Sequence, residues 1–505
     1  MSCYQPLLVH IQDMDHKQRS VVTVCNVLLT IIGFFLLFFW FSQWQKDHSD
    51  SLFLQPSTID PPAWYKSAPY NPYKVLEIQN QALNNNEVHE TPTTEEPKNI
   101  TAATLFPAKT TTFDPIDSEQ SLFESDASDS QKPCSKRIVG YYGGWDNQRL
   151  TENQMKKVSH LVFAFAKMNE KGEISFEKEE KKSLFLEMKK KAKEVNPAVK
   201  VMISIGGMYN SECFGKTVAN FKRRGILIDS ILSFLHKNQF DGVDIFWKWP
   251  KDQDKANYVF LLRELRHAMD KFQEQNQHQE SFLLTIVTPS VGFELMDGFH
   301  LNGILKYIDF INVETDRQAS RTPGPYTSAP APLFSMIGEY QGYNIDWTMK
   351  HLSCVTGNPK KLNMGVPFYG RFWKGVHQEA VEKGDDMWRT VETSSSGNAA
   401  SGTVFWRNLE KEGFSKSDGS WHEESRTPYI WDSKNRIFLG FENEKSLEEK
   451  MKYAVDKNLG GLTIWTLEMD DDVESLLEAV TSTCEEVRDS EVVQNSNQVK
   501  FQCEN

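Results

Sequence analysis

Residues 240–250, FDGVDIFWKWP, place charged and aromatic side chains at a spacing that could support chemistry. Asp244, Phe246 and Lys248 occupy alternate positions, and alternate residues of a β-strand point to the same face of its sheet. Asp241 lies three residues before Asp244. Carboxyl groups can act as general acids or bases, whereas a lysine with its ordinary pKa of about 10.4 is a poor proton donor at neutral pH. The carboxyl groups of this stretch, Asp241 and Asp244, therefore lie only in its first half.

Charge and composition narrow the class of ligand. The formal net charge is −13, from 56 basic and 69 acidic residues, which argues against a nucleic-acid-binding protein with a basic surface. Aromatic residues make up 12% of the chain, which is compatible with a neutral polar ligand such as a glycan. No pair of cysteines has the CxxC spacing of a zinc site, and the sequence implies no metal or other cofactor.

Eight short apolar runs that begin at Arg137 predict the elements that position these side chains. The runs are RIVGYYGG, SHLVFAFA, KVMISIGG, FDGVDIFW, FLLTIV, YIDFINV, LNMGVPF and GGLTIW. Continuous apolar runs are typical of strands buried on both faces of a parallel sheet. Segments with helical spacing of apolar residues, such as KKSLFLEMKKKAKEV, lie between several of them. The repeats predict an α/β fold, a closed (β/α)8 TIM barrel over residues 134–484.

The seventh and eighth runs are too far apart for a single crossover, because LNMGVPF ends at residue 368 and GGLTIW begins at residue 460. We therefore predict a small inserted α+β lobe at about residues 373–435. An open doubly wound sheet is the alternative fold. Its nucleotide-binding form is disfavoured because GYYGGW, which ends the first run, is no glycine-rich phosphate loop.

Seven motifs in order resemble those of glycoside hydrolase family 18, the chitinases and chitinase-like lectins, from about Arg137 to Glu478. They are GYYGGW, LVFAFA, SIGG, FDGVDIFWKWP, FINV, GVPFYGR and GGLTIWTLEMDD. The resemblance implies an active site at the carboxyl ends of the barrel strands and a DxxDxDxE motif on the fourth strand. In that motif the final Glu protonates the glycosidic oxygen. The last Asp orients the N-acetyl group of the substrate, whose own oxygen attacks the sugar carbon.

This chain departs from the motif at the two positions that the reaction needs most. Asp241 and Asp244 are kept, but Phe246 stands where the resemblance implies the orienting Asp, and Lys248 where it implies the proton donor. A cation about 4 Å from a positively charged sugar would raise the barrier by roughly 4 kcal/mol at an effective dielectric near 20. A lysine inside a barrel needs an acidic partner, and Asp241 and Asp244 are the candidates. The chain is therefore predicted to be no enzyme.

The resemblance also implies a Met-x-Tyr-Asp run after the sixth strand, where this chain has Glu314, Thr315, Asp316 and Arg317. The tyrosine that would contact the N-acetyl group is missing. Met208 follows SIGG, where family members often have Trp. These departures weaken sugar binding as well as catalysis. The new acids Glu314 and Asp316 raise the alternative of an active hydrolase with relocated acids.

Six residues match family positions that contact substrate. These candidate sugar-binding residues are Tyr141, Trp145, Phe165, Tyr369, Arg371 and Trp465. Aromatic rings at strand ends also stabilise by burial alone, and Arg371 can pair with a neighbouring acid. The resemblance implies a chitinase-like pseudoenzyme that binds chitin, related N-acetylglucosamine oligomers or protein partners without hydrolysing them. A protein-interaction scaffold with no sugar ligand is a further alternative.

The first 133 residues are predicted to lie outside the barrel. Residues 21–41 contain no charged side chain and are long enough for a transmembrane helix. Basic residues before this span predict a cytoplasmic tail at 1–20. Residues 42–133 are rich in Thr and Pro and predict a disordered stalk, with a glycosylation site at Asn99. We expect a single-pass type II membrane protein with a lumenal or extracellular barrel; a cleaved signal peptide is the alternative.

Five cysteines follow the predicted span: Cys134, Cys213, Cys354, Cys484 and Cys503. An odd number allows two disulfides and one remaining thiol, or an intermolecular bridge, and the spacing leaves the pairing open. Cys503 falls in a predicted C-terminal tail at residues 485–505.

Overall fold

A computed structural model describes most of the chain after residue 135. The described residues are 136–276, 280–291, 296–316, 326–334, 344–394, 399–491 and 501–503. The predicted cytoplasmic tail, span, stalk and Asn99 lie outside the described residues, and so does Arg317. Among the residues that are described, no helix is both long enough and apolar enough to cross a membrane.

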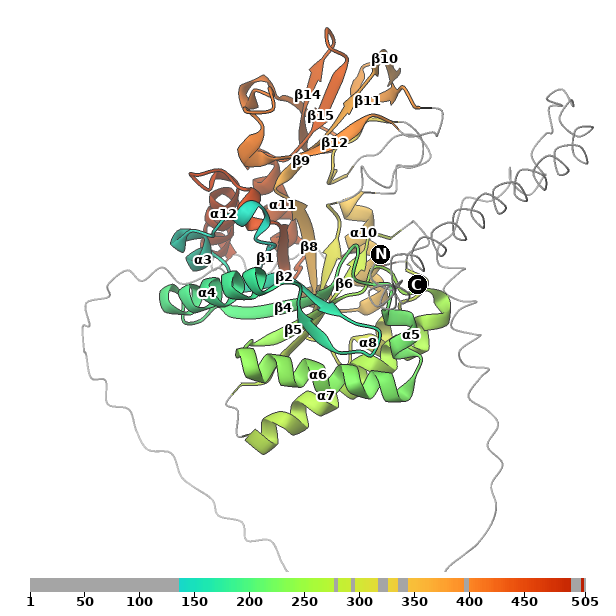
Figure 1. The fold of residues 1–505 in the computed structure, drawn as a ribbon. Coiled ribbons are helices and arrows are strands. Elements are labelled where there is room, and N and C mark those ends of the chain that lie inside the picture. The colour runs from blue at the N-terminus through green and yellow to red at the C-terminus, as the bar shows by residue number, and fades with distance from the viewer. Residues whose placement is uncertain are drawn as a thin grey trace, which may run out of the picture. The chain divides into compact units, whose positions relative to one another are not determined.

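Eight parallel strands close into a barrel (Figure 1). In chain order they are β1 (Arg137–Tyr142), β2 (His160–Met168), β4 (Lys200–Gly206), β5 (Gly242–Phe246), β6 (Leu283–Pro289), β7 (Phe310–Glu314), β8 (Leu362–Pro367) and β16 (Gly461–Trp465). Each pairs in parallel with the next, and β16 pairs with β1. Each of the eight predicted runs overlaps one of these strands. Closure confirms the barrel and excludes the open sheet.

Helices surround the barrel strands (Figure 1). They are α3 (Glu152–Lys157), α4 (Glu179–Val195), α5 (Phe214–Val218), α6 (Phe221–Asn238), α7 (Lys255–Asn276), α8 (Leu301–Ile304), α10 (Ile345–Thr356), α11 (Glu444–Asp456) and α12 (Ser475–Glu491). Their apolar residues recur at helical spacing, as in α6, which buries Leu227, Ile231 and Phe234. A short strand, β3 (Ile174–Phe176), adds to β2 in antiparallel fashion. The helices thus fix the strands whose carboxyl ends carry the candidate site.

A lobe of antiparallel strands is inserted in the sequence between β8 and α11 and is drawn at the top of Figure 1. Its strands are β9 (Tyr369–Lys374), β10 (Val376–Glu382), β11 (Asp385–Val391), β12 (Ser401–Phe405), β13 (Ser420–His422), β14 (Thr427–Asp432) and β15 (Ile437–Gly440). Five form a sheet in the order β12-β9-β15-β14-β13, and β10 pairs with β11. The predicted insertion at 373–435 falls within this segment. Its described residues form strands and short 3-10 turns, so the helix expected of an α+β lobe is not among them.

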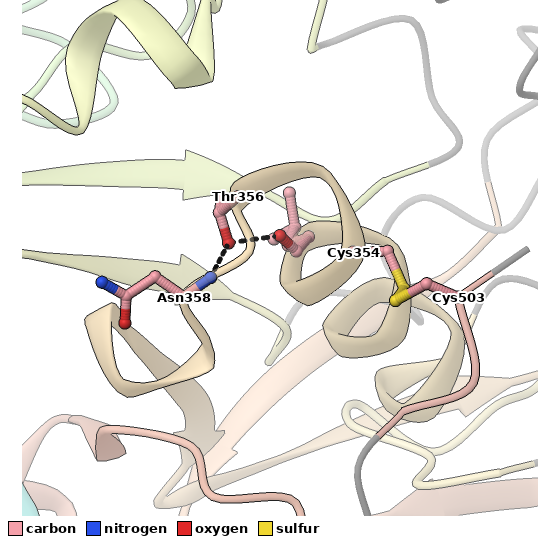
Figure 2. Close-up of a disulfide and its surroundings, with 5 residues drawn as sticks. Cys354, Thr356, Asn358 and Cys503 are labelled. Atoms are coloured by element: carbon pink, nitrogen blue, oxygen red, sulfur yellow. Dashed lines mark hydrogen bonds between the residues drawn. A yellow bond between two sulfur atoms is a disulfide. The ribbon is translucent and has the colours of Figure 1, made fainter. Parts of the chain in front are cut away.

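A disulfide joins Cys354 of α10 to Cys503 across 149 positions of sequence (Figure 2). Beside it, the Thr356 hydroxyl donates to the Leu352 carbonyl, in the last turn of α10. Cys484 is also disulfide-bonded, whereas Cys213 keeps its thiol. Residue 485, where the C-terminal tail was predicted to begin, lies inside α12.

Candidate functional site

Buried polar side chains form a network in the barrel interior around Asp244 of β5. Tyr141 and Ser204 donate their hydroxyl protons to Asp244 Oδ2 at 2.9 and 2.7 Å, and Thr285 donates to Oδ1 at 2.7 Å. Asn312 Nδ2 donates to the Tyr141 hydroxyl oxygen at 3.1 Å. Burial raises the pKa of Asp244 although these donors act to lower it. Burial beside this carboxyl also raises the pKa of Tyr141. Asp244 is therefore held by neighbouring strands beneath the site.

Lys248 forms an ion pair with Glu314 at the end of β7. Their side chains are only 10% and 7% exposed. The ammonium nitrogen also lies 5.1 Å from the ring centre of Phe246 and 5.2 Å from that of Trp249, within the range of cation–π attraction. The position where the resemblance implies a proton donor is thus occupied by a buried cation that is paired with a carboxylate.

Asp241 lies at the opposite end of β5 from this ion pair. Its Oδ2 is 2.8 Å from Lys193 Nζ of α4 and accepts the Val201 backbone N–H at 2.5 Å. It therefore stabilises the junction between α4 and the barrel strands. The prediction that Asp241 or Asp244 holds Lys248 is wrong: Asp241 is at the other end of the strand, Asp244 is engaged by hydroxyl groups, and the carboxylate comes from Glu314.

Phe246 lies within a cluster of aromatic rings. Its ring centre is 5.7 Å from that of Phe165, 6.1 Å from Trp465 and 6.3 Å from Tyr141. Trp465 is also 5.7 Å from Trp145 and 5.4 Å from Tyr141. The structure thus brings together four of the predicted sugar-binding residues. Their rings pack on one another and on Phe246, which is 4% exposed.

The cavity among these side chains has a volume of about 20 Å³. It is lined by Tyr141, Phe246, Val287, Asn312, Val313, Glu314, Asp316, Thr463 and Trp465. A cavity of this size holds about one water molecule, whereas small-molecule pockets measure roughly 300–1,000 Å³. A sugar ring does not fit among these residues while Phe246 and the ion pair keep their positions.

The two candidates on β9 are engaged in other contacts. The Tyr369 hydroxyl lies 2.8 Å from the Asp316 carbonyl oxygen, to which it donates, and 3.2 Å from its carboxylate. Arg371 donates to the Ser401 hydroxyl at 3.1 Å, and its guanidinium lies 5.4 Å from the ring centre of Trp373. Tyr369 therefore fixes the end of β7, and Arg371 packs within the lobe.

Tyr209 was not among the residues predicted from the sequence. It follows Met208 in the loop after β4. Tyr209 is 88% exposed and Met208 is 49% exposed. The signal that could have identified it is its place directly after the SIGG motif, at the carboxyl end of a barrel strand. With half-buried Trp145 and Trp249, these residues supply apolar surface at the carboxyl ends of the barrel strands.

Comparison with known proteins agrees with this architecture. Residues 137–470 match the sequence model of the family described as "Glycosyl hydrolases family 18". Chitinase A1 of Niallia circulans is 29% identical over 301 residues, which cover 55% of this chain and 42% of that protein. Chitinase-3-like protein 2 of Homo sapiens is 26% identical over 354 residues, covering 66% and 87%.

Solved structures share the fold at lower identity. YKL-39, crystallised in the presence of chitooligosaccharides, has a TM-score of 0.59 and 22% identity, covering 69% of this chain and 99% of that one. The likeness at this identity concerns the fold alone. The chain spans less than two thirds of several curated relatives, including 42% of Chitinase A1 and 65% of the endochitinase of Manduca sexta.

Proposed function

Because the chain belongs to glycosyl hydrolase family 18, we propose that it is a chitinase-like protein that binds a glycan without hydrolysing it. The observation that carries this proposal is the buried ion pair between Lys248 and Glu314. Hydrolysis needs a group that releases a proton to the leaving oxygen. Lys248 puts an ammonium group, paired with Glu314, at the position where the resemblance implies a carboxylic acid, so this position carries no carboxyl group to protonate the leaving oxygen.

Two further features support the loss of hydrolysis. Phe246 offers no oxygen to orient an N-acetyl group, and it narrows the space in which a sugar would react. The alternative of relocated acids is not favoured, because Glu314 is paired with Lys248 and Asp316 is bound by Tyr369. Both acids are also buried.

We propose that the ligand is chitin or an N-acetylglucosamine oligomer, bound across the mouth of the barrel. The exposed ring of Tyr209, the side chain of Met208 and the partly exposed ring of Trp145 supply the surface. Aromatic rings offer large apolar faces with little conformational freedom to lose. The relative named Chitinase A1, which is 29% identical, supports this ligand class.

The test combines binding and hydrolysis on the full chain. We expect calorimetry to detect binding of N-acetylglucosamine oligomers, with no release of reducing sugar. Tyr209→Ala should weaken binding about five- to tenfold, the size expected for one lost ring contact. Phe260→Ala, which removes a ring on the outer surface of α7 that is 39% exposed, is the matched control. Turnover at a rate typical of glycosidases would refute the proposal, and absence of binding would favour the protein-interaction scaffold.

We also propose that the chain is a single-pass type II membrane protein, with residues 21–41 as its anchor and a glycan on Asn99. The disulfide between Cys354 and Cys503 supports a barrel in an oxidising compartment. Asn99→Gln should remove a glycosidase-sensitive mobility shift in membrane fractions. A chain whose mobility is the same with and without Asn99 would contradict the glycan, and recovery in the aqueous phase without detergent would contradict the anchor.

A further inference from the structure

A lysine-lined groove lies between the carboxyl-terminal ends of α4 and α6. Its volume is about 580 Å³, within the range of ligand sites. It is lined by Leu186, Lys189, Lys190, Lys193, Glu194, Lys237, Asn238 and Gln239. Lys193 contacts the carbonyl of Val199 and the carboxylate of Asp241, just before β4 and β5 begin. The groove is therefore at the amino-terminal end of these strands, opposite the mouth.

Two of the four lysines hold the backbone in place. Lys189 donates to the carbonyl oxygens of Asn238 and Gln239 at 2.9 and 3.2 Å, at the carboxyl-terminal end of α6. Lys193 donates to the Val199 carbonyl at 2.7 Å. These contacts position both ammonium groups beside the groove. Lys189 contacts neutral carbonyls, whereas the Asp241 carboxylate compensates the charge of Lys193.

The other two lysines extend into solvent. The Lys190 side chain is 79% exposed, and its contact with Glu194 is long, at 3.8 Å. Lys237 is exposed at the end of α6. Four ammonium groups thus stand beside two carboxylates, Glu194 in the lining and Asp241 at Lys193, in a protein whose net charge is −13. Burial lowers the pKa of Lys189, although the nearby Asp241 carboxylate acts to raise it.

The chemistry of the lining selects among anionic partners. Among the described residues that line the groove none is aromatic, and Leu186 is the one large apolar side chain. Nucleic-acid bases therefore have no ring on which to stack, and an acidic peptide has no pocket for an apolar anchor. Lysines suit anionic groups as point charges. We infer that this groove binds the sulfate groups of a linear sulfated polysaccharide, independently of any ligand at the mouth.

The test uses the full chain and a size-defined heparin oligosaccharide as the probe. We expect binding by calorimetry at low salt that weakens steeply in about 0.5 M salt, because exposed charges are screened. Lys190→Gln combined with Lys237→Gln should weaken binding about tenfold, the change expected for the loss of two charged contacts. Lys171→Gln combined with Lys383→Gln, at exposed lysines that are not part of the lining, changes the net charge equally and should alter binding less than twofold.

Three results would overturn the inference. The first is the absence of heparin binding at low salt. The second is an equal loss of heparin affinity in both double variants, and the third is that a chemically desulfated oligosaccharide binds as tightly as heparin. Equal or tighter binding of poly-glutamate would assign the groove to an acidic peptide instead. Lys189 and Lys193 stay unchanged in every variant, so the contacts that end α6 are preserved and a folding defect is not expected.

Discussion

At the residue scale, the ion pair between Lys248 and Glu314 replaces a catalytic acid with a structural contact. The pair joins the carboxyl ends of β5 and β7, which are separated by β6 in the barrel. Removing one member of a buried pair is far more costly than replacing both, because the remaining charge loses its partner in a poorly solvated site. Removing one member of the pair should therefore lower the free energy of unfolding of the barrel.

Glu314→Gln should lower the free energy of unfolding by about 3 kcal/mol, since it removes the carboxylate beside the Lys248 ammonium. Urea unfolding followed by circular dichroism measures the change. Replacing both residues, as Lys248→Met with Glu314→Gln, should recover most of the loss. If the double variant is as unstable as Glu314→Gln alone, the ion pair is not the cause.

Restoring the motif acids should not restore efficient catalysis. Phe246→Asp with Lys248→Glu places the new carboxyl at position 248 beside Glu314 and leaves Asp316, where the resemblance implies the contacting tyrosine, unchanged. We expect no more than a trace of reducing sugar from chitin oligomers in a long incubation. Efficient turnover by this double variant would mean that the sixth barrel strand matters less than we infer.

The sequence predicted which positions of the site are altered but not how they contact one another. Alternation along the fourth barrel strand predicts that Asp244, Phe246 and Lys248 share a face. Comparison with the DxxDxDxE motif identifies Phe246 and Lys248 as the altered positions. The partner of Lys248 comes from β7, and the reach of side chains across an intervening strand depends on barrel geometry that sequence spacing does not contain. For the same reason, the packing of Phe246 on Trp465 could not be anticipated.

At the element scale, the buried carboxylate of Asp470 accepts hydrogen bonds from the first turn of α12, which begins at Ser475. Its Oδ1 accepts the backbone N–H groups of Asp471 and Leu476 at 2.9 and 3.2 Å, and its Oδ2 accepts that of Leu477 at 2.9 Å. Burial raises the pKa of Asp470 to about 7 and outweighs these donors, which lower it. A carboxyl with a raised pKa stabilises the fold below its unfolded pKa, and this contribution is lost as the pH rises through the folded value.

Asp470→Asn should therefore change the pH dependence of stability. Relative to the variant, the unmodified chain should lose up to about 4 kcal/mol of unfolding free energy between pH 4 and pH 8. Urea unfolding of both proteins across this range measures the difference, so that other titrating groups cancel. Parallel pH profiles for the two proteins would show that Asp470 does not titrate in this range.

Strands and helices of the barrel were predictable because each has one strong pattern. Continuous apolar runs such as KVMISIGG mark strands buried on both faces, and α6 repeats its apolar residues at helical spacing. The lobe was harder because strands such as β10 are largely exposed and β13 has only three residues. Short exposed strands depend on tertiary pairing more than on their own composition, which is why the predicted α+β content was wrong for the described part.

At the scale of the whole molecule, the disulfide between Cys354 and Cys503 ties the segment after α12 to α10. Cross-links between distant residues stabilise mainly by restricting the unfolded chain. Cys503→Ser should lower the free energy of unfolding by about 2–4 kcal/mol, measured by urea unfolding without reductant. Cys213→Ser removes the thiol that is not cross-linked and is the control. Equal effects of the two substitutions would mean that the cross-link itself contributes nothing.

The same disulfide encloses β8, the whole antiparallel lobe, β16 and α12 within one covalent ring. A protease that cleaves once within this ring, for example at exposed Lys383 in the turn between β10 and β11, opens the backbone without releasing a fragment. The nicked chain should migrate as one species without reductant and as two pieces with it. The lobe can therefore be cut and still remain attached to the barrel.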